Sequence, residues 1–497
     1  MDARRPDRTR AYLPQAVTAA ALAALTLWAW GFVLALPPTG ADAWPLLEQA
    51  SRALHDPGVL WRERYLEGVP IGASFWRPLF VGGFALQWGA FGGTAWPYHA
   101  LRLVAYLLLA LGAGSLARRR PDAGESAAFA AGALVLLHPL QADLLPSLAR
   151  SADVLADLAL CATLACLARE RPTRAALAFG ALAALAAPAI KESGLIAPLV
   201  GLAVLEPWRA GDGRGRRATS LVLLVGLVAH LALRWQRLGS VGSYAAGDAG
   251  GSDALNNAAL LAAGLADAAR AWQCGLLALL VVASLALSHG SEDSTRSVAR
   301  AWLRTRRGAL VWLALALVGA LASRRLAERH AVALLVPLAV LVAPSLGALT
   351  PRAGRERART AARVLLALAL LAVLAPRSPL WRHYAQWDVI AAATTGVLDA
   401  AEQAVRASEE RSAPVERSVG VVRVRASRTQ GVLRVAVAPF PKQAAPPTGP
   451  RAAALRQPMI LMPYSIAAAL RLRGVPGPIA IAPGRLLDVL PEHLSAR

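Results

Sequence analysis

The sequence has few charged residues and few cysteines. Charged residues make up 17% of its 497 positions, against about 25% in soluble globular proteins. All three cysteines, Cys161, Cys166 and Cys274, lie in apolar runs without the spacing of metal ligands. A glycine-rich phosphate loop and a nucleophile elbow are also missing. These absences argue against a cysteine-ligated metal centre, a P-loop nucleotide site and an elbow-type serine hydrolase, and no cofactor is expected.

Long apolar runs dominate the sequence. Hydrophobic residues make up 56% of the chain. Runs of roughly 12 to 24 residues recur down to about residue 376, many of them long enough or nearly long enough to cross a bilayer. Such repetition excludes a lone cleaved signal peptide. The expected fold class is an all-α polytopic membrane protein with about 11 transmembrane helices in residues 1–376, followed by a small α+β domain in residues 377–497. Strands are expected at Gly420–Arg425 and Val432–Ala438 and a helix at Ser465–Arg473.

The net charge of +22 does not indicate a nucleic-acid partner. The basic residues, all but two of them arginine, cluster in short segments between apolar runs, as the positive-inside rule describes. The arginines within residues 1–12 predict a cytoplasmic amino terminus, so the carboxy-terminal domain is expected outside the cytoplasm. The expected location is a bacterial inner membrane.

The same rule sets the predicted topology. Residues 37–97 form the first outer loop, and 75–91 is expected to be an interfacial helix because a span there would put the arginines at 118–120 outside. The Arg-rich segment 296–307 is expected to be an inner loop. The expected spans are Leu13–Leu36, Tyr98–Leu116, Ser126–Leu137, Ala152–Leu167, Ala175–Ala187, Gly194–Leu205, Ser220–Leu233, Cys274–Leu287, Ala309–Ala322, Ala331–Leu346 and Val364–Ala375.

Unusual polar residues collect on the outer side of this topology. Charges within a bilayer are costly unless they face a cavity, an interface or water. The set therefore predicts one outward site, although a solvated loop charge is the alternative for any single member. Its members are Asp42, Glu48, Arg77, His99, Arg102, His138, Asp143, Arg150, Asp153, Lys191, Glu192, Arg234, Glu328, Arg329 and His330.

Asp42 is the candidate general base. It follows Pro37-Pro38-Thr39-Gly40 just beyond the first span, where a partly desolvated carboxylate could take a proton. The competing interpretation is an ordinary helix N-cap that leads into residues 44–54. His99 and His138 are acid–base candidates by residue type, with a hydrogen-bonded structural role as the alternative for both.

Lys191 and Glu192 form an outward turn in a chain that otherwise uses arginine. A lysine ammonium is a compact charge suited to a phosphate, and a neighbouring carboxylate can position it. Glu328 and Arg329 repeat this pairing of anion and cation. Two or three such cations around one cavity predict binding of a pyrophosphate or a lipid phosphate.

Several motifs, in this order, resemble the membrane part of C-type (GT-C) glycosyltransferases. The sequence is most similar to the protein O-mannosyltransferase-like group, which includes the transmembrane and tetratricopeptide-repeat mannosyltransferases and their bacterial relatives. The likeness covers about residues 10–350. The motifs are Asp42, Arg77-Pro78, Tyr98-His99, His138-Pro139-x-Gln141-x-Asp143 with Asp153, Lys191-Glu192 with Pro198, and Ala327-Glu328-Arg329-His330.

The resemblance implies an activity and assigns roles. Members of that family move a sugar from a polyprenyl-phosphate lipid to an acceptor on the outer face with inversion, and a carboxylate of the first outer loop is the base. Carried over, this implies protein glycosylation at the cell envelope with Asp42 as the catalytic residue. The residues expected to bind the donor phosphate are Lys191, Arg329, Arg150 and Arg102. The residues expected to orient them are His138, Asp143, Asp153, Glu192, Glu328, Arg77 and His99.

The chain also departs from the family pattern. One Asp stands where the family has two, and the substituted positions are Gln141 for His, Asp143 for Glu, Arg150-Ser151 for Gly-Arg and His330 for Tyr. Two alternatives therefore stay open: a transporter or flippase of a lipid-linked substrate, and an inactive membrane scaffold of the same fold. The enzyme hypothesis predicts that Asp42 lies within ~15 Å of Lys191 and Arg329 around one pocket.

Overall fold

The computed structural model describes most of the first 239 residues and shorter parts of the remainder. The described residues are 8–40, 42–67, 69, 75–119, 124–138, 141, 144–169, 171–205, 214–239, 258, 295–321, 332–347, 379–411, 415–419, 422–429, 432–439, 463–475 and 479–481. Within them the chain is mostly helical, which confirms that part of the predicted fold class.

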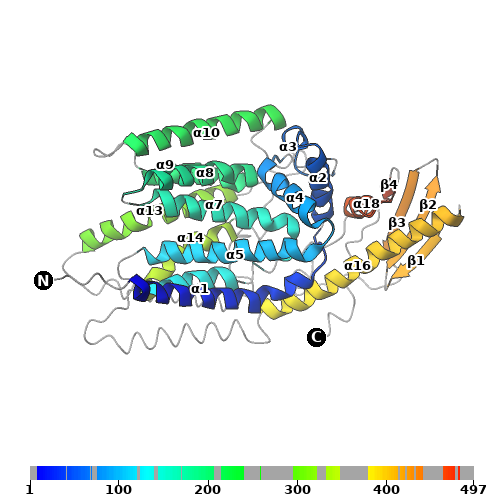
Figure 1. Ribbon diagram of the computed structural model, residues 1–497, viewed down its shortest axis with the longest axis horizontal. Helices are drawn as coiled ribbons and strands as arrows, with labels where there is room; N and C mark the ends of the chain where they lie inside the picture. The colour runs from blue at the N-terminus through cyan, green and yellow to red at the C-terminus, as the bar shows by residue number, and fades with distance from the viewer. Residues whose placement is uncertain are drawn as a thin grey trace.

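The first half of the chain forms a helical bundle. Its helices run side by side along the long axis of the molecule, and two short helices of the segment between α1 and α5, α2 and α4, lie across one end (Figure 1). Extensive pairings join α7 to α8, α5 to α6 and α14 to α6. The bundle elements are α1 (Arg8–Trp30), η1 (Gly31–Ala35), α5 (Ala95–Arg118), α6 (Gly124–Leu137), η3 (Leu148–Arg150), α7 (Ser151–Leu167), α8 (Arg174–Ile190), η4 (Glu192–Leu195), α9 (Ile196–Leu205), α10 (Arg214–Leu238), α13 (Thr295–Leu321) and α14 (Val332–Gly347). The loop helices are α2 (Ala43–His55), α3 (Val59–Arg62) and α4 (Pro78–Phe91).

Three helices among the described residues are long and apolar enough to cross a bilayer. They cover Pro14–Ala35, Ala95–Arg118 and Arg214–Leu238, and several shorter apolar helices of 10–17 residues lie beside them. On α10 the side chains of Leu221, Val225 and Val228 are more than half exposed, as expected for a surface that faces lipid rather than water. The helices therefore fit a chain that crosses the membrane more than once.

The helices differ from the expected spans mainly at their ends. α13 begins at Thr295, so the Arg-rich segment 296–307, predicted as an inner loop, is helical. α10 likewise begins at Arg214, several residues before the predicted span. Arginine is a good helix former, and its long side chain can reach the headgroups from within a helix. The spans predicted at Cys274–Leu287 and Val364–Ala375 lie outside the described residues, as does the loop 324–330.

The carboxy-terminal part combines a four-stranded sheet with two helices, α16 (Pro379–Arg411) and α18 (Pro463–Leu472). The strand order is β1-β2-β3-β4, antiparallel except for the parallel β3–β4 pair. The strands are β1 (Val415–Val419), β2 (Val422–Thr429), β3 (Val432–Pro439) and β4 (Ile479–Ile481). β2 begins two residues after the start of the strand predicted at 420–425 and extends four residues beyond it, because it pairs with β1 and β3 on either side.

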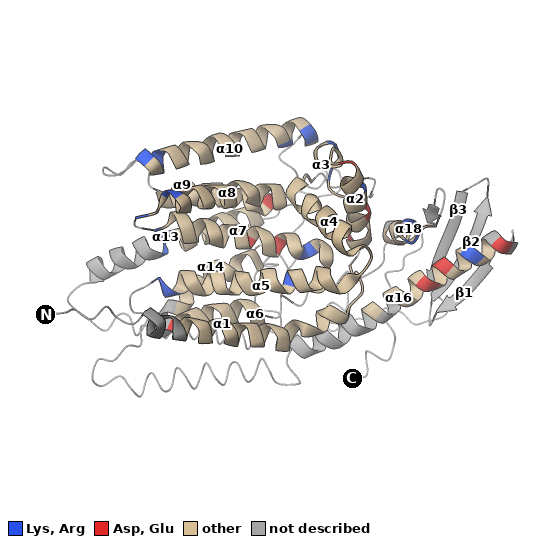
Figure 2. Cartoon of the chain, in the orientation of Figure 1, with Lys and Arg blue, Asp and Glu red and all other residues tan. Residues whose placement is uncertain are grey.

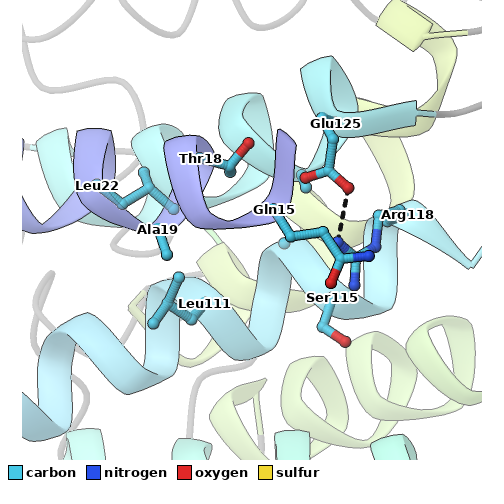
Figure 3. Close-up of a pocket in the computed structure, with 10 residues that line it drawn as sticks. Gln15, Thr18, Ala19, Leu22, Leu111, Ser115, Arg118 and Glu125 are labelled. Carbon is cyan, nitrogen blue, oxygen red and sulfur yellow. Dashed lines mark hydrogen bonds and ion pairs between the residues drawn. The ribbon is translucent and has the colours of Figure 1, made fainter. Parts of the chain in front are cut away.

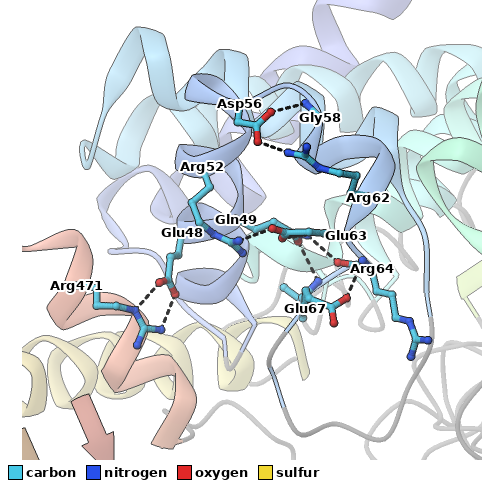
Figure 4. Close-up of polar contacts among 11 residues, drawn as sticks. Glu48, Gln49, Arg52, Asp56, Gly58, Arg62, Glu63, Arg64, Glu67 and Arg471 are labelled. Carbon is cyan, nitrogen blue, oxygen red and sulfur yellow. Dashed lines mark hydrogen bonds and ion pairs between the residues drawn. The ribbon is translucent and has the colours of Figure 1, made fainter. Parts of the chain in front are cut away.

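Two hydrophobic cores hold the molecule together. One lies inside the bundle, where Trp30, Tyr106 and Trp312 are almost fully buried. The second joins α2 and α4 to α16 and α18, with α18 packed directly on α2. An ion pair at its edge links Arg471 of α18 to Glu48 of α2, with Nη2 2.8 Å from Oε2 (Figure 4).

Candidate active site

The short segment before α2 is held tightly against residues 146 and 147 of the connection between α6 and α7. Thr39 forms an isolated parallel bridge with Ser147, and its hydroxyl donates to the Pro146 carbonyl at 2.6 Å. Gly40 adopts a φ of 95°, and a Cβ there would lie 2.5 Å from Ser147 Oγ. Only glycine fits both this backbone conformation and this close approach. The structure therefore joins the loop that carries Asp42 to the polar block between α6 and α7.

Asp42 occupies the N-cap position of α2, but its side chain makes no capping hydrogen bond. The carboxylate is partly exposed and its charge acts on the buried phenol of Tyr65. Burial is the main cause that raises the pKa of Tyr65, and the charges of Asp42 and Glu192 raise it further, while Arg77 opposes them. Asp42 thus lies in the electrostatic neighbourhood of Arg77 and Glu192.

Arg77 and Glu192 form a forked ion pair between the start of α4 and the α8–α9 turn. Nη2 and Nε of Arg77 donate to Oε2 of Glu192 at 2.7 and 3.1 Å. Arg234 of α10, fully buried, contributes a second guanidinium to the same carboxylate, with Nη2 3.3 Å from Oε1. The Arg77 guanidinium also lies over the Tyr65 ring, 4.3 Å from its centroid. One carboxylate therefore joins three separate segments of the chain.

The ion pair shifts the pKa of Arg77 and the pKa of Glu192, each in the direction that favours the charged form. Burial alone would raise the pKa of Glu192, but the charge and hydrogen bonds of Arg77, with the charge of Arg234, hold it below its ordinary value. Burial would lower the pKa of Arg77, but Glu192 and Tyr65 raise it instead. Both groups are therefore charged at neutral pH.

Lys191 pairs with Asp153 and not with its neighbour Glu192. Its ammonium donates to Oδ1 of Asp153 in the first turn of α7, and both side chains are largely buried. The charge of Asp153 also reaches Arg77, so the two ion pairs belong to one cluster. One turn further along α7, Asp157 is buried beneath this pair. Lys191 and Glu192 lie in an extended backbone and a 3-10 turn, which directs consecutive side chains to different partners.

Arg102 of α5 presents a different kind of site. Its Nη1 donates to the Leu145 carbonyl, while Nε and Nη2 are buried without a hydrogen-bond partner. Those two atoms form the side of the guanidinium that binds a carboxylate or phosphate with two parallel hydrogen bonds. His99, one turn earlier, is within 3.4 Å of the Pro37 carbonyl through Nε2 and has no partner for Nδ1. Gln141, fully buried, also lacks partners for its side-chain amide.

The predicted site residues fall into three groups in the structure. One group is linked by ion pairs or by charge (Asp42, Arg77, Asp153, Lys191 and Glu192). A second lies on α5 and on the connection from α6 to α7: His99 contacts the Pro37 carbonyl and Arg102 the Leu145 carbonyl, His138 follows α6 directly, and Arg150 is the last residue before α7. The third group (Asp143, Glu328, Arg329 and His330) lies outside the described residues, so the expected distance from Asp42 to Arg329 stays a prediction. Figure 2 shows charged residues at both ends of the bundle, with acidic and basic ones together toward the end covered by α2 and α4 and mainly basic ones at the other end.

Two members of the cluster had no assigned role in the sequence analysis. Arg234 was noted as an outer polar residue in an apolar run, but its partner is 42 positions away. Tyr65 had no signal at all, because an aromatic residue in a loop is common. Both are defined by contacts between segments that no local pattern encodes.

Comparison with known proteins adds little. The chain matches no family model and no curated protein. Among solved structures it is similar to ArnT from Cupriavidus metallidurans in the apo state, with 17% sequence identity and a TM-score of 0.47. It is also similar to ArnT from the same organism bound to undecaprenyl phosphate, with 19% identity and a TM-score of 0.44. Each match covers 79% of this chain and 72% of the other. Similarity at this level leaves the reaction to be inferred from the site residues.

Proposed function

We propose that this chain is a GT-C-type membrane glycosyltransferase that moves a sugar from a polyprenyl-phosphate donor to an acceptor hydroxyl on the extracytoplasmic face. The observation that carries the proposal is the unpartnered side of the Arg102 guanidinium. Arg102 is buried one turn along α5 from His99, which contacts the Pro37 carbonyl in the segment that leads to Asp42. A buried cation with two donors free is costly unless an anion binds there. A phosphate next to a candidate base is what such a transfer requires.

The reaction assigns a separate task to each group. Asp42 takes the proton of the acceptor hydroxyl, whose oxygen then attacks the anomeric carbon. The bond from that carbon to the phosphate oxygen breaks, and the phosphate leaves with the electron pair. Arg102 stabilises the charge that grows on the leaving phosphate. A single displacement of this kind inverts the anomeric centre.

The ion-pair cluster positions this machinery. Glu192 ties Arg77 and Arg234 together, and Asp153 holds Lys191. In the proposal Lys191 turns toward the donor phosphate when the lipid binds, and Arg150 and Arg329 add to it. His138, Asp143 and Glu328 orient these cations. The donor sugar is proposed to be a hexose such as mannose, the lipid to be of the undecaprenyl type, and the acceptor to be a cell-envelope protein.

The test uses membranes that contain the full chain, a radiolabelled polyprenyl-phosphate hexose and an extracted envelope-protein fraction. Asp42→Asn should lower transfer at least about 100-fold, because general-base catalysis contributes about 10²–10⁴, and should leave donor binding intact. Equal transfer by the wild type and Asp42→Asn would remove Asp42 from its role. Glu67→Gln, in the same loop, is the matched control and should retain full transfer.

A second pair of variants tests the phosphate contact. Arg102→Lys keeps the charge but loses the two-pronged donor set, so donor binding should weaken about tenfold, as for one lost hydrogen bond to a charged group. Donor binding unchanged in Arg102→Lys would refute the phosphate role of this residue. Movement of the labelled lipid between leaflets without any transfer would instead support the flippase alternative.

A further inference from the structure

A cavity lies at the other end of the bundle, away from Asp42. Its volume is about 200 Å³, and it opens between the first turns of α1, the last turns of α5 and the start of α6 (Figure 3). The apolar segments Pro14–Ala35 and Ala95–Arg118 are both long enough to span a bilayer. The cavity lies beside the first residues of one and the last residues of the other, so it lies where a span meets the membrane surface. The helix ends here are rich in arginine, with Arg118 and Arg119 at the end of α5 and Arg214, Arg216 and Arg217 in the first turn of α10.

The lining of this cavity changes from polar to apolar. Gln15, Thr18, Ser115, Arg118 and Glu125 provide polar groups. The rest of the wall is made of small and aliphatic residues, namely Ala19, Leu22, Leu111, Gly114 and Ala128. Such a gradient suits a molecule with a polar head and an apolar tail. At about 200 Å³ the cavity is smaller than a typical ligand pocket of about 300–1,000 Å³, so it would hold a head and not a whole lipid.

The polar end offers one charge of each sign. Arg118 Nη1 donates to Glu125 Oε1 at 2.7 Å, an ion pair that is only partly exposed. The second carboxylate oxygen, Oε2, is buried and has no hydrogen-bond partner. A buried carboxylate oxygen without a donor is costly, and a ligand that brings an N–H group would satisfy it. The Arg118 guanidinium beside it can donate hydrogen bonds to the phosphate of the same ligand.

We infer that this cavity binds the headgroup of a phospholipid that carries a primary ammonium next to its phosphate, as in phosphatidylethanolamine. The ammonium donates to Glu125 Oε2, and the phosphate lies near Arg118 and Gln15. The acyl chains leave along the apolar wall toward the bilayer. The binding stabilises the junction of α1, α5 and α6, and it is independent of the sugar transfer proposed above.

The test compares two lipids that differ only at the amine. Purified full-length protein in detergent is mixed with phosphatidylethanolamine or phosphatidylcholine of identical chains, and binding is measured by native mass spectrometry. Choline has no N–H to donate, so the wild type should bind the ethanolamine lipid about tenfold more tightly, as for one hydrogen bond to a charged group. Equal binding of the two lipids would overturn the inference. Tighter binding of phosphatidylglycerol than of either would also overturn it, because an anionic lipid needs no carboxylate partner.

A variant pair locates the preference. Glu125→Gln should reduce the preference for the ethanolamine lipid to less than about threefold, because an amide oxygen is a weaker acceptor for an ammonium. Glu63→Gln, which alters a carboxylate of the first outer loop, is the control and should keep the tenfold preference. An unchanged preference in Glu125→Gln would place the lipid elsewhere. The wild-type comparison needs no variant, so a folding defect in Glu125→Gln would not hide the result.

Discussion

Arginine does different work at the two ends of the bundle. At the end near Asp42, Arg77 and Arg234 are buried and donate to the carboxylate of Glu192 across gaps of 115 and 42 positions. At the other end, Arg119 donates to the Leu164 carbonyl at 3.0 Å and Arg216 to the Arg169 carbonyl at 3.1 Å. The second kind of contact closes the end of a helix, where carbonyls lack partners within the helix.

The partner of each arginine, a buried carboxylate or a terminal carbonyl, distinguishes a candidate site from an ordinary helix end. A buried ion pair costs desolvation and contributes little to stability unless its geometry is good, so the cluster of such pairs near Asp42 supports the function proposed above. A cation that donates to terminal carbonyls stabilises the end of that helix, and it does so without an anionic partner. In the proposed function arginine thus serves the site at the end near Asp42, while Arg119 and Arg216 close helix ends at the other. The predictions below test this contrast, from the largest expected effect to the smallest.

Glu192→Gln should destabilise the protein most. It leaves the guanidiniums of Arg77 and Arg234 buried without their shared carboxylate. Breaking a buried ion pair from one side costs about 3–5 kcal/mol. The free energy of unfolding, measured by denaturant titration in detergent, should fall by that order. A loss as small as that of the control Glu63→Gln, whose partner Arg52 is half exposed and whose pair should contribute about 0–1 kcal/mol, would show that the cluster is not tightly coupled.

The same carboxylate should make stability depend on pH. The folded-state pKa of Glu192 lies below its ordinary value of 4.5, so the unfolded chain binds a proton first as the pH falls. Its contribution is therefore complete above about pH 4.5 and is lost as the pH falls through the lower, folded-state pKa. The wild type should lose stability over that window, and Glu192→Gln should lose less. Parallel pH profiles for the two proteins would contradict the assignment.

Gly40→Ala should disturb the Asp42 loop by a smaller amount. The new Cβ would lie 2.5 Å from Ser147 Oγ, at a φ of 95° that a side chain rarely adopts. Backbone strain of this kind costs about 1–3 kcal/mol. Removing the hydroxyl in Gly40→Ala/Ser147→Ala should restore only the part due to the contact, because the backbone conformation is unchanged. Full recovery in the double variant would show that φ is not a constraint here.

The sequence predicted the helices better than the site. Long apolar runs with arginine at their ends are local patterns, so α5 and α6 begin and end close to where they were expected, while α1 begins earlier and gives way to η1 before the expected end. The predicted start of α13 was wrong because arginine is compatible with both a loop and a helix. The site was harder because its pairs are remote. Asp153 could be assigned to orienting a cation from the sequence. That this cation is Lys191, while Glu192 pairs with Arg77, depends on the backbone of residues 191–195 between α8 and α9.

Arg119→Ala should have the smallest effect and complete the contrast. It removes donors to the Leu164 and Ala165 carbonyls in the last turns of α7, a surface contact of the kind that contributes about 0.3–1 kcal/mol at a helix C-terminus. Arg119→Lys should retain most of this, because a single cation still meets the carbonyls. Transfer activity should be unchanged in both variants, since the contact has no carboxylate partner and lies at the far end of the bundle from Asp42. A loss comparable to that of Glu192→Gln would mean that arginines at both ends are structurally equivalent.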